Sequence, residues 1–203
     1  MESRDSILLE AHYWPCISYF KTIKQAKALH LEAQEHYQKG SYRNRLYVPA
    51  SNGVQLLSVP LEKGKNQHIP IQEVQISNRL PWRRAQWKTI YFLYKSAPYF
   101  EHYEPELQSL FMEEEQFLFQ QNVKILRWLM QQFQLKVAVH YTAEYEANPA
   151  QHTDLRNTIT PSTASTNTPI YFQPFSDKVG FKSNMSALDL LLMNGPEAAA
   201  MLV

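Results

Sequence analysis

The chain has 203 residues, a length that one domain, or one domain with a small appendage, normally occupies. Hydrophobic residues make up 44% of the chain and aromatic residues 13%, which is enough to fill a core and excludes a chain that is disordered throughout. Lys and Arg total 20 against 19 for Asp and Glu, and this balance argues against a protein that coats nucleic acid.

The cysteine content and the N-terminal residues point to one compartment. The single cysteine, Cys16, excludes an internal disulfide and suits the reducing cytoplasm, where we expect the protein to act. Residues 1–10 carry charged side chains where a secretory leader would have a long apolar run. No stretch approaches the roughly 18 consecutive apolar residues of a membrane helix, so we expect no membrane insertion.

The first 33 residues predict a βαβ unit. Residues 6–14 read as a buried strand, and Pro15 suits the first turn of a helix, where its missing N–H costs nothing. Apolar residues follow at helical spacing over 17–24, and residues 28–33 read as a second strand. Cys16, at the start of this helix, is expected to be a small buried residue.

A β-hairpin is predicted next, at the point where we expect the sheet to turn antiparallel. Residues 45–48 and 54–59 flank Asn52-Gly53, a pair that tolerates positive φ angles. Residues 69–76 are expected to form a third β segment.

The remainder is predicted to be mainly helical at first and irregular later. The expected fold class is α/β, with α+β as the alternative, built on a mixed central sheet within one domain over residues 1–203. The expected elements are a helix from Pro81, a long amphipathic segment from Pro105 to Gln134 that divides near 113–115, a strand over 136–145, a flexible loop or flap over 148–169 rich in Thr, Ser, Asn and Pro, a short strand over 170–175, and a helix over 185–193 that ends at Asn194-Gly195-Pro196.

The most unusual polar segment precedes the hairpin and reads Gln38-Lys39-Gly40-Ser41-Tyr42-Arg43-Asn44-Arg45. Alternation along a strand sends Arg43 and Arg45 to one face. Arginine forks bind phosphate or carboxylate in a bidentate manner, and Lys39 adds a point charge. The segment therefore predicts a site for a phosphorylated or nucleotide-linked small molecule, and the alternative is a solvated edge strand protected by charge.

Two further clusters are candidates. In the segment 82–88, Trp82 is expected in the core, whereas Trp87 and Lys88 lie off the apolar stripe and are candidate pocket residues. His12 lies at the carboxyl end of the first predicted strand, where ligands gather in open α/β sheets, and is a candidate catalytic acid or base. The alternative for His12 is an ordinary capping or buried histidine.

Several familiar signatures are absent from the sequence. It holds no Gly-rich phosphate loop and no G-x-S-x-G elbow. With one Cys and no H-E-x-x-H, we expect no metal site, and no cofactor can be named.

Motifs along nearly the whole chain, in the right order, resemble those of the WbqC-like family. They are Leu8-Leu9-Glu10-Ala11-His12-Tyr13-Trp14-Pro15 with Tyr19-Phe20, the segment 38–45, Asn52-Gly53-Val54-Gln55, Leu57-Ser58-Val59-Pro60, Trp87-Lys88-Thr89-Ile90, Ser96-Ala97-Pro98-Tyr99-Phe100, Phe175-Ser176-Asp177-Lys178, Ser186-Ala187-Leu188-Asp189-Leu190-Leu191 and Asn194-Gly195-Pro196. The chain departs from the commoner pattern with Ser18 in place of Gly, His12 in place of Gln and a shorter stretch over 162–168.

This resemblance implies a cytoplasmic protein of bacterial surface-polysaccharide assembly, because the family is named for a protein encoded among genes for lipopolysaccharide O-antigen synthesis. The expected partner is a nucleotide-activated amino sugar, and the expected reaction is transfer of an acyl or aminoacyl group to a sugar amine. In this scheme His12 is the general base, Lys39, Arg43 and Arg45 hold phosphate, and Lys88 and Asn194 are further substrate contacts. Tyr42 and Asn44 would orient the sugar and Trp87 would stack on a ring.

The alternative function is a non-catalytic binding subunit of an assembly complex. It is motivated by the absence of a known catalytic signature, and it makes Trp82, Trp87, Tyr99 and Phe100 interface anchors. Nucleic-acid binding is disfavoured by the balanced charge, and the oligomeric state is left open.

Overall fold

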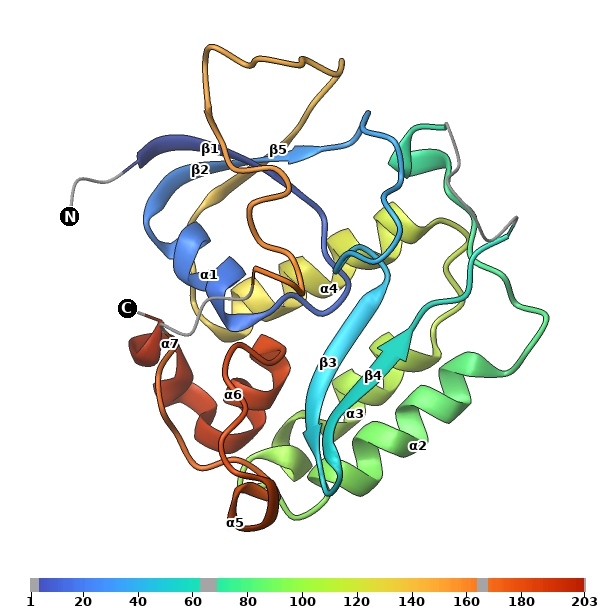
Figure 1. Ribbon diagram of the computed structural model, residues 1–203, viewed down its shortest axis with the longest axis vertical. Coiled ribbons are helices and arrows are strands. Elements are labelled where there is room, and N and C mark those ends of the chain that lie inside the picture. Colours follow the sequence, from blue (N-terminus) through green and yellow to red (C-terminus); the bar gives the residue numbers. More distant parts are fainter. Residues whose placement is uncertain (1–3, 63–68, 164–167, 203) are drawn as a thin grey trace.

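The computed structural model describes residues 4–62, 69–163 and 168–202 (Figure 1). Four parallel strands form a sheet in the order β5-β2-β1-β6. Helix α1 (Ile17–Lys24) connects the two central strands, which confirms the predicted βαβ unit. The strands are β1 (Arg4–Glu10), β2 (Ala26–Glu32), β5 (Ala138–Tyr141) and β6 (Thr153–Asp154).

One face of this sheet builds the core. Ile7 and Leu9 of β1 and Leu29 of β2 are fully buried. Helices α1 and α4 (Leu118–Gln132) lie on the same side of the sheet (Figure 1). The ring of Phe20 on α1 packs at 5.0 Å from that of Phe133 at the end of α4. This apolar cluster continues into the C-terminal helix α6 (Ala187–Asn194).

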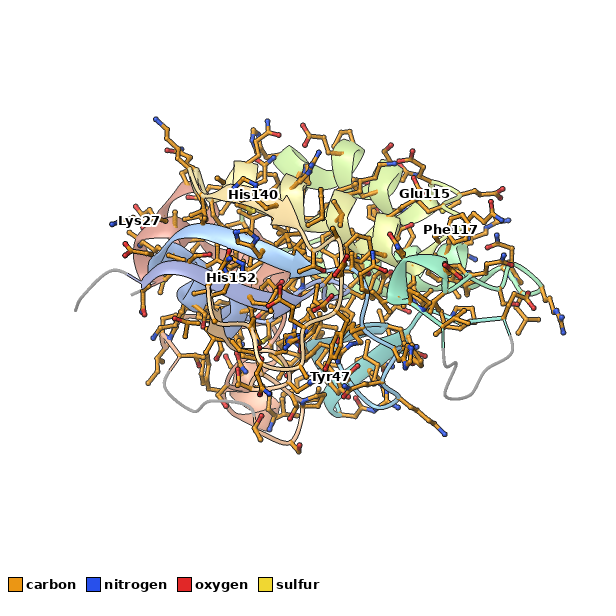
Figure 2. All side chains as sticks on the ribbon, turned by 90° about the horizontal axis from the view of Figure 1, so that it is seen from above. Lys27, Tyr47, Glu115, Phe117, His140 and His152 are labelled. Atoms are coloured by element: carbon orange, nitrogen blue, oxygen red, sulfur yellow. The ribbon has the colours of Figure 1, made fainter. Side chains whose placement is uncertain are left out.

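The opposite face carries a stack of imidazoles. His30 of β2 pairs in register with His140 of β5, and their ring centroids are 4.9 Å apart. His152, directly before β6, stacks on His30 at 3.9 Å, and Figure 2 shows His140 and His152 over the strands. Parallel sheets normally have both faces covered, and here the connection from β5 to β6 runs across this side (Figure 1).

The predicted hairpin is confirmed and consists of β3 (Arg45–Ala50) and β4 (Gly53–Ser58). Gly53, with φ of +121°, closes the turn. The hairpin forms a two-stranded sheet of its own and is not paired with any of the four parallel strands. The expected α/β class is thus realised as a parallel sheet with a separate antiparallel ribbon.

The helices in the middle of the chain follow the predicted pattern, except that one of them begins earlier than predicted. Helix α2 (Trp82–Tyr94) begins directly after Pro81 as expected. The long amphipathic segment divides into α3 (Phe100–Met112) and α4, near the predicted break. Helix α3 begins at the buried Phe100, so that Pro105 lies inside the helix instead of starting it.

Two predicted strands are wrong. Residues 69–76 form the 3₁₀ helix η1 (Ile71–Glu73) with isolated bridges on either side. Its buried residues Ile71 and Val74 are spaced by three, and Pro70 has no N–H for a ladder. Residues 170–175 are irregular, because the buried side chains of Tyr171 and Gln173 bind Asp189 on α6 in place of a strand partner.

The C-terminal region consists of short helices. They are α5 (Ser176–Val179), α6, η2 (Gly195–Glu197) and α7 (Ala198–Met201). Helix α6 ends at Gly195, which has φ of +53°, as the Asn-Gly-Pro sequence predicts. Within the described residues, no helix has the length and apolar character needed to cross a bilayer.

Candidate functional site

The carboxyl ends of the parallel strands open onto a cleft of about 920 Å³, which we call the edge cleft. Its walls come from the loop over 34–40 after β2, from the first residue of β3 and from the segment around β6. Ligands of open α/β sheets bind at this edge, because the loops that leave the strands converge there. The lining residues are Gln34, Glu35, His36, Tyr37, Gln38, Lys39, Gly40, Arg45, Tyr145, Arg156 and Asn157.

Two of the predicted cations line the edge cleft. Lys39 is exposed and Arg45 is half-buried. Across the described ranges, neither side chain forms a salt bridge. The cleft therefore presents two cationic groups to solvent without a carboxylate against them.

The third cation, Arg43, lies in the floor behind the cleft and is only 1% exposed. Its Nε and Nη2 donate to the two carboxylate oxygens of Glu35 at 2.7 and 2.5 Å, and Nη2 also donates to Asn157 Oδ1 at 2.9 Å. Burial raises the pKa of Glu35, and the Arg43 fork opposes that rise only in part. Arg43 is thus placed to hold the cleft floor together, with no donor directed at a ligand.

Glu10 extends this buried network to the end of β1. Its Oε1 lies 3.8 Å from an Arg43 nitrogen, and its Oε2 accepts from the Asn157 backbone N–H at 3.0 Å. Burial works to raise the pKa of Glu10, but the hydrogen bond from His12, the charge of Arg43 and the Asn157 N–H outweigh it and lower the pKa to about 2. Asn157, with φ of +60°, ties the segment after β6 to the floor of the cleft.

His12 sits behind Glu10 and does not line the edge cleft. It is fully buried, and its Nε2 contacts Glu10 Oε1 at 3.0 Å. The imidazole lies against the rings of Tyr19 and Tyr42, with centroids at 4.6 and 5.3 Å. Burial lowers its pKa, which favours the neutral ring. His12 Nδ1 has no hydrogen-bond partner among the described residues.

A second arginine, whose side chain is 5% exposed, lies at the other wall of the edge cleft. Arg156 donates through Nε and Nη2 to the carboxylate of Asp154 at 2.9 and 2.8 Å, and through Nη1 to Glu32 at 2.7 Å. Its guanidinium also lies 4.8 Å from the ring of Tyr145, which is 56% exposed. These bonds raise the pKa of Arg156 and fix an exposed aromatic ring at the rim of the cleft.

The remaining predicted contacts are dispersed. Tyr42 is buried against His12, and Asn44 bonds Tyr37 Oη and the Val59 carbonyl. Both therefore support the wall and do not line the cleft. Trp87 and Lys88 line a separate groove between α2 and α3, and Asn194 caps the end of α6 by donating to the Leu190 carbonyl.

Several lining residues were not singled out by the sequence. The acid Glu35 follows the second strand, and its position just beyond the carboxyl end of that strand was an available signal. Tyr145, Arg156 and Asn157 lie near or within a Thr-rich segment that was predicted as a flap, and nothing in their spacing marks them. Residues 164–167 of that flap lie outside the described residues.

No metal site is apparent. In residues 4–62, 69–163 and 168–202, no group of three or more His, Cys, Asp or Glu side chains could hold an ion. The expected buried character of Cys16 is confirmed, and burial raises the pKa of its thiol to about 11.

Comparison with known proteins identifies relatives. The sequence profile described as "WbqC-like protein family" matches residues 10–168. A Mycobacterium tuberculosis (strain ATCC 25618 / H37Rv) protein named "Uncharacterized protein Rv1507c" is 27% identical over 108 residues, which cover 53% of this chain and 46% of that protein. The match thus spans about half the length of this curated relative. No solved structure matches the chain.

Proposed function

The chain belongs to the WbqC-like protein family, and we propose that it is an enzyme of bacterial surface-polysaccharide assembly that binds a nucleotide-activated amino sugar in the edge cleft. The observation that carries this proposal is the pair Lys39 and Arg45, which face the cleft at the carboxyl edge of the sheet without acidic partners. Cytoplasmic location and a role in O-antigen synthesis are part of the same proposal and rest on the family resemblance.

The shape and chemistry of the edge cleft suit such a ligand. A volume of about 920 Å³ is at the upper end of the range for small-molecule sites. Lys39 and Arg45 supply charge for a diphosphate, and each charge-assisted hydrogen bond contributes about 1.5–3 kcal/mol. The exposed ring of Tyr145 offers a stacking surface for a base or sugar.

In the proposed reaction the sugar amine attacks the carbonyl carbon of an acyl or aminoacyl thioester; a C–N bond forms, the C–S bond breaks, and the thiol leaves with the proton that the amine gives up. The amine must lose a proton, and Glu35 is the proposed base, because it is a carboxylate in the cleft wall and burial raises its pKa. His12 serves as a positioning residue, because its hydrogen bond orients Glu10 within the buried network. Arg43 holds Glu35 in place.

Calorimetric titration with UDP-N-acetylglucosamine tests the binding step. We expect Lys39→Gln and Arg45→Gln each to weaken binding by about tenfold or more. Arg79→Gln is the matched control, because Arg79 is an exposed arginine paired with Glu62 away from the cleft, and it should leave affinity unchanged. Equal affinity in wild type and Arg45→Gln, or no heat with any nucleotide sugar, removes the support for this function.

A binding subunit is the second candidate, and the groove between α2 and α3 favours it. This groove of about 420 Å³ is lined by Trp87, Tyr91, Phe92 and Met112, and Phe92 is 65% exposed. Exposed aromatic side chains of this kind are typical interface anchors. Co-purification of a partner that is lost in Phe92→Glu and retained in Arg45→Gln supports this function, and the reverse pattern contradicts it.

A further inference from the structure

A second large hollow adjoins the edge cleft, and the proposed function leaves it unused. It has a volume of about 850 Å³ and lies where the end of β2, η1, the start of α4 and the end of β5 meet. Figure 2 shows Phe117, one of its lining residues, at the end of α4 away from His152. We call it the apolar hollow, and its lining residues are Ala33, Gln72, Glu73, Phe117, Phe119, Gln120, Val123, Lys124, Arg127, Tyr141 and Thr142.

The two cavities share a wall. Ala33 lines the apolar hollow, and the next residue, Gln34, lines the edge cleft. Thr142 fixes this wall, because its hydroxyl accepts from the Ala33 N–H at 2.9 Å and donates to Glu32 at 2.6 Å. Ligands in the two cavities would therefore be separated by little more than the end of one strand.

The main wall of the hollow is apolar and partly uncovered. Phe119 and Tyr141 meet edge to face with ring centroids 5.9 Å apart. Tyr141 is 42% exposed, while Phe117 and Val123 are half-buried. Apolar surface that stays in contact with water is unfavourable, so an apolar ligand is stabilised by covering this wall.

The charges of the lining define one anion-binding group. Lys124 is already bound to Glu113 at 2.5 Å and to Glu115 at 3.0 Å. Arg127 donates to the Tyr141 hydroxyl at 2.7 Å, and within the described part of the chain it has no carboxylate partner. Its guanidinium is therefore an uncompensated cation held beside an aromatic wall.

Glu73 sets the limit on ligand charge. It is an exposed carboxylate in the lining, on η1. A ligand with several negative charges, such as a nucleotide diphosphate, would meet repulsion from Glu73, whereas a ligand with one anionic end needs only Arg127. The edge cleft differs, because two cations without carboxylate partners among the described residues, Lys39 and Arg45, line it.

We propose that the apolar hollow is a second binding site, which takes an aliphatic or aromatic group carrying a single carboxylate. The site is built from the Phe119–Tyr141 wall and the unpaired Arg127. This binding does not rest on the proposed function.

Calorimetry on the full chain tests this site with octanoate as the probe. Octanol supplies the chain without the charge, and acetate supplies the charge without the chain. Val123→Trp fills the hollow, and Arg127→Gln removes the cation at an exposed position. Lys39→Gln, in the edge cleft, is the matched control.

We expect octanoate to bind wild type at least tenfold more tightly than either octanol or acetate. Val123→Trp should abolish octanoate binding and Arg127→Gln should weaken it about tenfold or more, while Lys39→Gln leaves it unchanged. Octanoate and UDP-N-acetylglucosamine should bind together. No octanoate binding, equal affinity in wild type and Arg127→Gln, or mutual exclusion of the two ligands overturns the inference. If octanoate binds and the nucleotide sugar does not, only the proposed function is contradicted. If the nucleotide sugar binds and octanoate does not, only this inference is contradicted.

Discussion

Asp189→Asn should remove a pH dependence from the stability of the fold. Asp189 on α6 is fully buried and accepts hydrogen bonds from Tyr94 at 2.7 Å, Tyr171 at 2.5 Å and Gln173 at 2.8 Å. No salt bridge neutralises it within the described residues. Burial raises the pKa of this carboxyl from its ordinary 3.8 to about 6, and the three hydrogen bonds offset only part of that effect.

The magnitude follows from the size of the shift. A rise of about two pH units corresponds to about 3 kcal/mol in the free energy of unfolding. Well below its ordinary pKa of 3.8 the carboxyl is protonated in both folded and unfolded chains. As the pH rises toward 6, the unfolded chain releases its proton first, so ionisation favours unfolding. The contribution of Asp189 is therefore present in acid and is lost as the pH rises through 6.

Urea denaturation of wild type and Asp189→Asn, at steps from about pH 4 to about pH 7.5, measures this effect. The stability of wild type relative to the variant should fall by roughly 2–3 kcal/mol across that range, since Asn does not titrate. Asp177→Asn, an exposed acid on α5, is the matched control and should run parallel to wild type. A flat difference between wild type and Asp189→Asn, or one that grows with pH, refutes the reasoning.

Three further predictions concern the site and one turn. Arg43→Met leaves the buried carboxylate of Glu35 without its cation and should lower the free energy of unfolding by roughly 3–5 kcal/mol. The control Arg79→Met, at an exposed ion pair, should lower it by less than about 1 kcal/mol. Urea denaturation of both variants measures the difference, and equal losses would contradict the prediction. Gly195→Ala should be more destabilising than Gly40→Ala in thermal melts, because an added Cβ at 195 would overlap the Tyr99 ring while the space at 40 is open. Equal losses would show that backbone strain alone matters. Affinity for nucleotide sugar should fall as salt is raised in calorimetry, and a salt-independent affinity would contradict charge recognition.

Local elements were predictable where neighbouring residues decide the conformation. The βαβ unit, the turn at Asn52-Gly53 and the start of α2 after Pro81 all depend on spacings of a few residues. The strand predicted over 69–76 failed because Pro70 and the spacing of buried residues favour a 3₁₀ turn. The strand predicted over 170–175 failed because its alternating residues serve a buried side-chain cluster instead of a sheet.

The sequence alone also identified the cationic segment that contributes Lys39 and Arg45 to the edge cleft. The sequence could not show that Lys39 and Arg45 line the cleft while Arg43 is buried, because residue type and alternation do not reveal whether a charge has a partner. Folding supplied that partner in Glu35 and placed Asn157, 114 positions away, against the same guanidinium.

Residue types and short-range spacing therefore determined the class of fold and the kind of ligand to consider. The tertiary structure decided which charges remain free, because several of the ion pairs and hydrogen bonds around the edge cleft join segments that only the packed sheet and its loops bring together. The Arg156–Glu32 pair spans 124 positions and the Asn157–Glu10 bond spans 147. Since a charge that has found its partner cannot hold a ligand at the same time, these distant contacts select the binding groups.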